Sequence, residues 1–360
     1  MYLSTRAIIE QQAREPVERG SWLGHTARAM TKVLGDIGAG LAQCVRGVKW
    51  VRAARNGVRS PWPALVVVLL GCGGVSEFAA DTTAGFLADA APAARAYFDY
   101  ESAGIAAANG IVQLEGLHRV SPGNIRIRMS LAQAYVAYAF GWVMDAQEQA
   151  QFAGDYERAD HESQRAFLMY SRAQALVVSV MHDRDAQIDG YLKGDPDKLR
   201  AYLAREYDDP DDDIEVVFWC AVAWGSAITN SPSMDALIDL PAAKAFAEHS
   251  VSLNPGYEHG GALTLLGGFE ASYPEQLGGN WKKGRAYFER ALNLSHRRSQ
   301  LHHVNFARTY AVNAQDRELF VRLMREVIES PDQGDDVRLS NKVARRRAER
   351  YLAHVDDLFE

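Results

Sequence analysis

Residues 245–251 read AFAEHSV, and 41 residues later residues 286–292 read AYFERAL, with small, aromatic and acidic residues in a related order. A tetratricopeptide repeat is about 34 residues long, so an insertion of about seven residues would explain the longer offset. Residues 273–280 (YPEQLGGN) are the natural place for that insertion, and residues 170–175 (YSRAQA) give a weaker third copy. Because one helix pair leaves an apolar face bare until the next pair stacks on it, the repeats predict a curved superhelix with a concave face.

The rest of the chain after residue 72 also has helical periodicity. Two apolar series recur at steps of three and four residues: Leu131, Tyr135, Tyr138 and Trp142, and Val217, Cys220, Trp224 and Ile228. Helix starts are marked by Asp195 followed by Pro196, and by the acidic run 208–213, which would favour the positive end of a helix dipole. No run of alternating apolar and polar residues predicts a sheet. We therefore expect an all-α fold, a tetratricopeptide-like superhelix of helical hairpins that forms a single large domain over residues 73–360.

Ahead of this domain, residues 65–72 read LVVVLLGC, a short apolar run that ends in a small residue and a cysteine. The run is too short to span a membrane, which takes about 20 apolar residues, and it has the length of a signal-peptide core. With arginines upstream, residues 51–72 are predicted to be a lipoprotein signal peptide, cleaved between Gly71 and Cys72, with acylation of Cys72. The alternative is a buried strand or a short core helix. Residues 1–50 would then be a disordered leader or the result of a start assigned too early.

Charge is divided unevenly along the chain. The formal net charge is −7, and residues 1–72 contain ten Lys and Arg against four Asp and Glu. The leader is therefore +6 and the remainder −13. An acidic body argues against nucleic acid and against an anionic membrane surface as partners, because both favour patches of Lys and Arg. Membrane attachment would come from acyl chains, in which each buried CH₂ contributes about 0.8 kcal/mol.

The three cysteines do not predict a disulfide. Cys44 lies in the leader, Cys72 is the lipidation candidate, and Cys220 alone remains in the body. Cys220 lies in the apolar segment VVFWCAVAW, residues 216–224. We expect it to be a small core residue and not a nucleophile.

These features together resemble the T-component family of TRAP transporters, lipid-anchored periplasmic proteins built from tetratricopeptide-like helix pairs. The resemblance covers nearly all of residues 73–357. The segments that carry it follow the family's order: WCAVAW at 219–224, LNPGYEHGGA at 253–262, YPEQLGGN at 273–280, AYFERAL at 286–292, QDRELF at 315–320, LSN at 339–341 and the basic helix 342–350.

The resemblance implies an accessory role in transport. The protein would lie in the periplasm, form a homotrimer and bind the soluble solute-binding subunit of a TRAP system. Each protomer would contain a channel or cleft for a small organic ligand, either hydrophobic or acidic. No catalytic activity and no cofactor are expected. Gly73, which follows the acylated cysteine where an aspartate would favour the inner membrane, indicates the outer membrane as the site of the anchor.

Candidate contacts to a ligand or partner come from one aromatic residue and from connecting segments. Trp219 lies five residues from Trp224 and cannot share its narrow helix face, so we expect Trp219 to point out of the core. Asn230, Tyr273 and Gln276 lie on connecting segments, where polar groups meet a ligand without interrupting a helix.

A metal site is not expected. No HExxH motif occurs, and the adjacent His302 and His303 would point about 100° apart on a helix. His259 lies in a turn, where we expect it to cap or to bond a loop carbonyl, and it is retained as a candidate contact. The glycine-containing segment 277–284 lacks the GxxxxGK[ST] frame of a phosphate loop. Asn280 is instead expected to cap the next helix.

A second interpretation fits the same features: a lipid-anchored helical-repeat scaffold for envelope or cell-wall assembly. It shares the signal, the fold and the lack of catalytic motifs. Residues 273–280 and 315–320 favour the transporter family, because a generic repeat does not require either segment.

Overall fold

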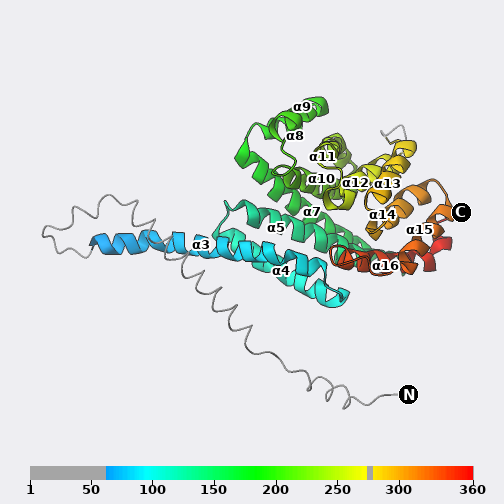
Figure 1. Cartoon of the computed structure of the whole chain (residues 1–360), viewed down its shortest axis with the longest axis horizontal. Coiled ribbons are helices and arrows are strands. Elements are labelled where there is room, and N and C mark those ends of the chain that lie inside the picture. Colours follow the sequence, from blue (N-terminus) through cyan, green and yellow to red (C-terminus); the bar gives the residue numbers. More distant parts are fainter. Residues whose placement is uncertain (1–61, 274–278, 360) are drawn as a thin grey trace, which may run out of the picture. The chain divides into compact units, whose positions relative to one another are not determined.

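The computed structural model describes the backbone of residues 62–273 and 279–359, with side chains from residue 76 onward (Figure 1). The chain divides into two units, Met1–Leu70 and Gly71–Glu360, and the second is described below. The predicted leader and the first half of the predicted signal peptide, residues 51–61, lie outside the described residues. The backbone at Gly71 and Cys72 belongs to helix α3 (Trp62–Arg95), and their cleavage and acylation stay predictions.

The described residues are helical and include no strand, which confirms the all-α prediction. The α-helices after α3 are α4 (Tyr100–Val120), α5 (Ile125–Tyr138), α6 (Met144–Phe152), α7 (Tyr156–Arg184), α8 (Ile188–Leu192), α9 (Pro196–Glu206), α10 (Ile214–Thr229), α11 (Leu240–Leu253), α12 (Gly261–Ser272), α13 (Trp281–Leu294), α14 (Gln300–Asn305), α15 (Arg317–Glu329) and α16 (Arg338–Ala353). The shorter elements are the π-helical turns η1 (Ala139–Val143) and η5 (Phe306–Ala311), and the 3₁₀ turns η2 (Met234–Asp239), η3 (Tyr257–Gly260) and η6 (Val355–Asp357). Within the described part of the chain, no helix combines the length and the apolar character needed to cross a bilayer.

Three helices in the C-terminal half lie next to one another and run in the same direction: α10, α12, and the helix that α14 forms with η5 (Figure 1). A Cβ atom at Gly261 would meet the ring of Phe218, and one at Gly225 would meet the ring of Phe269, so the starts and the later turns of α10 and α12 are aligned. Near the start of α12, Thr264 Oγ1 lies 2.7 Å from His302 Nδ1 in α14. Near the end of α12, the carbonyl oxygen of Ala271 accepts a hydrogen bond from Asn313 Nδ2, just after η5, at 3.0 Å. These two helices therefore also run in the same direction. Each of these helices is followed in the chain by an antiparallel partner: α11 follows α10, α13 follows α12, and α15 follows η5. These hairpins are the helix pairs that the sequence predicts.

The two copies of the repeat occupy equivalent places. Residues 245–251 lie in α11 and residues 286–292 lie in α13, the second helices of neighbouring hairpins. Phe246 is fully buried, whereas Tyr287, its counterpart 41 residues later, is half-buried and the next residue, Phe288, is fully buried. Each copy therefore contributes a buried aromatic residue to the core, at positions that differ by one.

The predicted insertion, residues 273–280, is the connection between α12 and α13, and residues 274–278 of it lie outside the described part. Where the chain returns, the backbone N–H of Asn280 donates to the carbonyl oxygen of Glu270 at 2.8 Å. The Asn280 side chain accepts a hydrogen bond from the backbone N–H of Lys283 at 2.9 Å. The predicted cap of α13 is confirmed.

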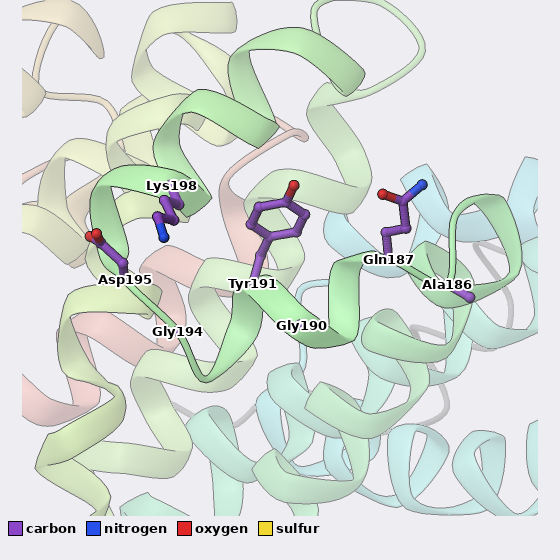
Figure 2. Close-up of a pocket in the computed structure, with 7 residues that line it drawn as sticks. All are labelled: Ala186, Gln187, Gly190, Tyr191, Gly194, Asp195 and Lys198. Atoms are coloured by element: carbon purple, nitrogen blue, oxygen red, sulfur yellow. The ribbon is translucent and has the colours of Figure 1, made fainter.

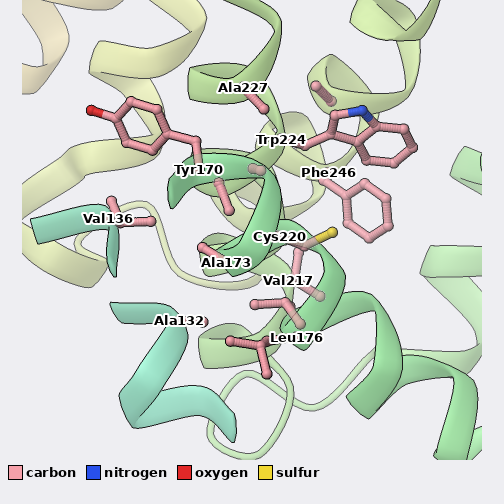
Figure 3. Packing of buried hydrophobic residues seen from close by; sticks show 14 of the residues in the cluster. Ala132, Val136, Tyr170, Ala173, Leu176, Val217, Cys220, Trp224, Ala227 and Phe246 are labelled. Atoms are coloured by element: carbon pink, nitrogen blue, oxygen red, sulfur yellow. The ribbon is translucent and has the colours of Figure 1, made fainter. Parts of the chain in front are cut away.

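The second predicted apolar series is confirmed, because all of its residues are buried. Cys220 is fully buried in the same cluster as Val217, Trp224 and Phe246 (Figure 3). Burial raises the pKa of the Cys220 thiol well above its ordinary value. The cysteine is a core residue, as expected.

The first predicted series is only partly right. Leu131 is buried, but Tyr135, Tyr138 and Trp142 are half-buried. Tyr135 and Tyr138 pack against the edge of the core, and the ring of Trp142, in the π-helical turn η1 that follows α5, stacks on that of Tyr138 at 5.8 Å. Trp142 points toward the start of α4, where its Nε1 donates to the carbonyl oxygen of Tyr100 at 3.1 Å. The later residues of the series thus stay together, but other helices cover them only in part.

Both predicted helix starts are present. Asp195 accepts a hydrogen bond from the backbone N–H of Asp197 at 2.9 Å, and Pro196 begins α9. Asp213 precedes α10, but its carboxylate does not bond the first turn of that helix. It forms an ion pair with Arg184 from the end of α7, which fixes α7 against α10.

The last long helix, α16, ties the C-terminal hairpin to the N-terminal helices. It packs on α14 and α15, and its arginines bond α6. Arg346 Nε donates to Asp145 Oδ2 at 2.7 Å, and Arg350 bonds both Asp145 and Glu148. Burial raises the pKa of Asp145, but hydrogen bonds and charge from the two arginines outweigh this effect and hold that pKa below its ordinary value. The carboxylate therefore stays ionised at neutral pH.

We predict opposite effects for two glycine-to-alanine changes in neighbouring helices. A Cβ atom at position 225 would lie 2.5 Å from Phe269 Cζ, so Gly225→Ala should lower the free energy of unfolding by about 1–3 kcal/mol. Gly268 has nothing within 4 Å of its would-be Cβ, so Gly268→Ala should raise it by about 0.5–1 kcal/mol. Urea unfolding followed by circular dichroism measures both. Equal effects of the two changes would show that the packing of α10 on α12 is looser than described.

Candidate functional site

The candidate site is a half-exposed surface formed by α10, α12, and α14 with η5, which we call the inner face. On each helix its members recur at steps of three and four residues, on the side that is not buried between hairpins. The members are Trp219, Val222, Ser226 and Asn230 from α10, Leu265 and Gly268 from α12, and Leu301, Asn305, Arg308 and Thr309 from α14 and η5. Because the three helices are parallel neighbours, these stripes lie side by side. The inner face is apolar and neutral polar, with Arg308 as its charged member.

Trp219 lies in the inner face, outside the buried stripe of α10. Its ring meets that of Phe218 edge to face at 5.2 Å, and Phe218 in turn meets Tyr257 at 5.2 Å. The indole Nε1 of Trp219 is buried and has no hydrogen-bond partner of good geometry in the described part of the chain. Burial raises the pKa of Tyr257 to about 12, with the nearby carboxylates adding to the shift and Trp219 opposing it. Tyr257 is the polar neighbour of the Trp219 indole N–H, and the half-buried indole ring is the part of Trp219 that the inner face presents.

Asn230 and Tyr273 lie at the same end of the stack, because α10 and α12 are parallel and each residue directly follows its helix. Asn230 is half-buried, and its Nδ2 donates to the carbonyl oxygen of Ser226 at 2.8 Å. Its amide donor is thus partly used in closing α10. Tyr273 is half-buried, and burial raises the pKa of its hydroxyl. Gln276 lies outside the described residues, so its place stays a prediction.

His259 differs from the expectation in one respect. Its ring does not bond a loop carbonyl: Nε2 lies 3.8 Å from Asp336 Oδ2, and the residue has a positive φ of 59°. Its own carbonyl oxygen is the acceptor, at 2.9 Å from Nε2 of His302. The side chain therefore faces the α15–α16 connection and does not join Trp219 in one site.

His302 and His303 point to different partners, as their adjacency predicts. His302 Nδ1 lies 2.7 Å from Thr264 Oγ1, whereas His303 Nε2 lies 3.2 Å from Glu326 Oε2. Burial lowers the pKa of His302 to about 4, so its ring is neutral at pH 7. Within the described residues, no three His, Cys, Asp or Glu side chains form a group that could hold a metal ion.

Arg308 is the inner-face residue that the sequence analysis did not single out. It lies in the π-helical turn η5, and its guanidinium carbon is 5.8 Å from the centroid of the Tyr351 ring. It forms no ion pair with another described residue. Half-buried arginines without a carboxylate partner can bind an anion in a bidentate manner, and π-helical turns are frequent at functional sites. The chain contains 39 Lys and Arg residues. Only the tertiary structure shows that Arg308, unlike the arginines with carboxylate partners, forms no ion pair with a described residue.

Two open hollows lie away from the inner face. One lies along α8 and α9 and is lined by Tyr191, Asp195 and Lys198 among others (Figure 2). The other follows α15. Neither contains a residue of the inner face or a predicted site residue. In the first hollow Tyr191 stacks on Tyr202 at 4.4 Å and Asp195 caps α9, so both side chains already have structural partners.

The fold and the inner face together define a class: a helical-repeat protein whose parallel inner helices present a binding surface. The family model described as TRAP transporter T-component matches residues 98–359, and the chain belongs to this family. The match begins at residue 98 and leaves all of α3 outside, whereas the resemblance was expected from residue 73. No curated protein matches the chain.

We predict that His302 makes the fold sensitive to acid. Because its folded pKa of about 4 lies below the ordinary value near 6.5, the unfolded chain binds more protons between these values. Stability should therefore be complete above pH 6.5 and fall as the pH drops toward 4. In His302→Gln the free energy of unfolding should decrease less between pH 6.5 and pH 4 than in the native protein. At pH 7 the variant should be less stable by about 1–3 kcal/mol, because it loses hydrogen bonds.

Urea unfolding at pH 7, 6 and 5 measures this slope. His182→Gln is the matched control, because the His182 ring is about half exposed. An unchanged pH slope in His302→Gln would show that His302 does not titrate with a lowered pKa.

Proposed function

We propose that this protein is a periplasmic, lipid-anchored accessory component of a TRAP transport system that binds the solute-binding subunit and receives a small organic ligand on its inner face. Membership of the T-component family supports the transport role. The observation that carries the ligand proposal is the inner face, an apolar and polar surface with the Trp219 indole ring at one place and, at another, an arginine that forms no ion pair with a described residue.

The composition of the inner face indicates the chemistry of its ligand. Val222, Leu265 and Leu301 would contact an apolar part, and the guanidinium of Arg308 would pair with a carboxylate. Trp219 would supply a flat apolar surface. A partly hydrophobic organic acid fits this arrangement better than a sugar, which would need more polar side chains, or a cation, which would need carboxylates.

Attachment to the membrane would come from Cys72. A single acyl chain gives only reversible binding, whereas several chains on one cysteine hold firmly. We propose the outer membrane as the site of the anchor, on the basis of Gly73. We further propose that the protein forms a homotrimer, has no enzymatic activity and does not bind nucleic acid.

We predict that the acylated chain, extracted in detergent and incubated with periplasmic extract of its source organism, retains a TRAP-type solute-binding protein detectable by mass spectrometry. Cys72→Ala protein from the soluble fraction is the control for contacts made by the anchor. Retention of cell-wall or envelope-assembly proteins in its place would favour the scaffold interpretation.

We predict that Trp219→Ala and Arg308→Ala lose a small molecule that co-purifies with the native protein. Native mass spectrometry of the freshly purified protein measures the bound mass. Trp281→Ala is the matched control, since Trp281 is 41% exposed on α13 and lies outside the inner face. Loss of at least tenfold in occupancy is expected for the first two variants, and equal occupancy in all of them would exclude the inner face as the binding surface.

We predict that Cys72→Ala abolishes incorporation of labelled palmitate and moves the protein from the membrane fraction to the soluble fraction. The reason is that the cysteine sulfur carries the acyl chains. Cys44→Ala, in the leader, is the control and should leave both unchanged. Continued membrane fractionation of Cys72→Ala would rule out the acyl anchor.

A further inference from the structure

Helix α4 carries apolar residues on two sides. Its buried side, with Ala103, Gly104, Ile111 and Leu114, packs on the body of the protein. Its outer side exposes Ile105 at 68% and Val112 at 72% of their surface. A helix that is apolar on both sides usually lies between two neighbours. In the described part of the chain, α4 packs on α5 and α16, and its Leu117 packs against the cluster of Ala80, Ala84 and Ile127, but no described residue covers the outer side.

The exposed residues form a regular stripe. Ile105, Asn109, Val112 and Gly116 follow one another at steps of four, three and four residues, and all are exposed. We call these four residues the α4 stripe. From residue 102 to residue 114 the helix contains no charged residue. This pattern is typical of a helix that packs lengthwise on another helix.

The geometry points to a second copy of this chain as the occupant, with two α4 helices packed antiparallel about a two-fold axis. In that arrangement Ile105 of each copy lies opposite Gly116 of the other, and Asn109 lies opposite Val112. A large residue thus meets a small one at both ends of the stripe. An isologous contact of this kind uses the same patch on both copies.

Charge at the ends of α4 selects the antiparallel direction. Glu101 lies near the start of the helix with 72% of its side chain exposed, and Arg119 lies exposed near the end. Glu101 lies 3.9 Å from Arg346 of its own chain but stays mostly exposed. Antiparallel packing brings it also to Arg119 of the other copy, whereas parallel packing would place like charges together. The stripe itself carries no Lys or Arg, which argues against an anionic bilayer as the occupant.

This contact is separate from the proposed trimer. A closed trimer uses a head-to-tail contact between two different patches, whereas the α4 contact joins one patch to itself. It would therefore pair two protomers, or two trimers. It does not depend on the inner face or on the solute-binding subunit.

The test is the mass of the acylated full chain in detergent, by light scattering with the detergent subtracted. We expect an even number of copies for the native protein and half that mass for Ile105→Lys and for Val112→Lys. Leu168→Lys, at a residue on α7 that is 60% exposed, should leave the mass unchanged. Circular dichroism confirms that each variant is folded.

A charge exchange distinguishes a second copy from any other occupant. Glu101→Arg and Arg119→Glu should each weaken pairing at least tenfold, and the double variant should restore it, since both end contacts are then re-formed with reversed sign. An odd number of copies in the native protein, or failure of the double variant to restore pairing, would overturn the proposal. A third result would also overturn the proposal: Ile105→Lys keeps the native mass but no longer binds neutral phosphatidylcholine vesicles. The α4 stripe would then contact a bilayer and not a second copy.

The outcome is independent of the proposed transport role. A protein that fails to pair through α4 but still retains the solute-binding subunit contradicts only the α4 contact. A protein that pairs but retains no such subunit contradicts only the transport partner.

Discussion

The close approach of neighbouring helices through glycine is the constraint on which the rest of the structure depends. The rings of Phe218 and Phe269 lie against Gly261 and Gly225, and the ring of Phe288 lies against Gly267. No side chain larger than hydrogen fits at these three places without movement of an aromatic ring or of a helix. Because protein interiors are close-packed, such contacts fix the spacing of the parallel pair α10 and α12 and of the antiparallel pair α12 and α13 within narrow limits. The inner-face stripes of α10 and α12 lie side by side because of this spacing.

A second constraint operates between the two ends of the repeat array. Helix α16 carries arginines whose partners, Asp145 and Glu148, lie about 200 residues earlier in the chain. A buried carboxylate without its arginines would be costly, so the cluster specifies one position for α16. The lowered pKa of Asp145 shows that its ionised form is the stable one in the fold. The cluster thus couples the position of α16 to the N-terminal helices.

Two surfaces with different chemistry remain after packing. The inner face combines apolar residues with one arginine and an indole ring, which suits a small organic acid. The α4 stripe is uncharged, and Glu101 and Arg119 lie beyond its two ends, which suits a helix of opposite direction.

The sequence alone determined the helices, their pairing and the family, because these depend on local spacing. The Asp195 and Asn280 caps, the buried Cys220 and the repeat in α11 and α13 were all predictable from residues close together in the chain. Trp219 could be separated from the core by its five-residue distance from Trp224. Gln276 and residues 51–61 of the predicted signal peptide lie outside what the structure describes.

Only the tertiary structure decided which faces stay open and which charges stay unpaired. Trp142 stacks on Tyr138 and bonds the backbone of Tyr100 instead of being buried in the core, and the His259 ring faces Asp336. Arg308 combines a half-buried position on the inner face with the absence of an ion pair to a described residue. These properties depend on contacts between residues tens to hundreds of positions apart, and no local period or motif encodes such contacts.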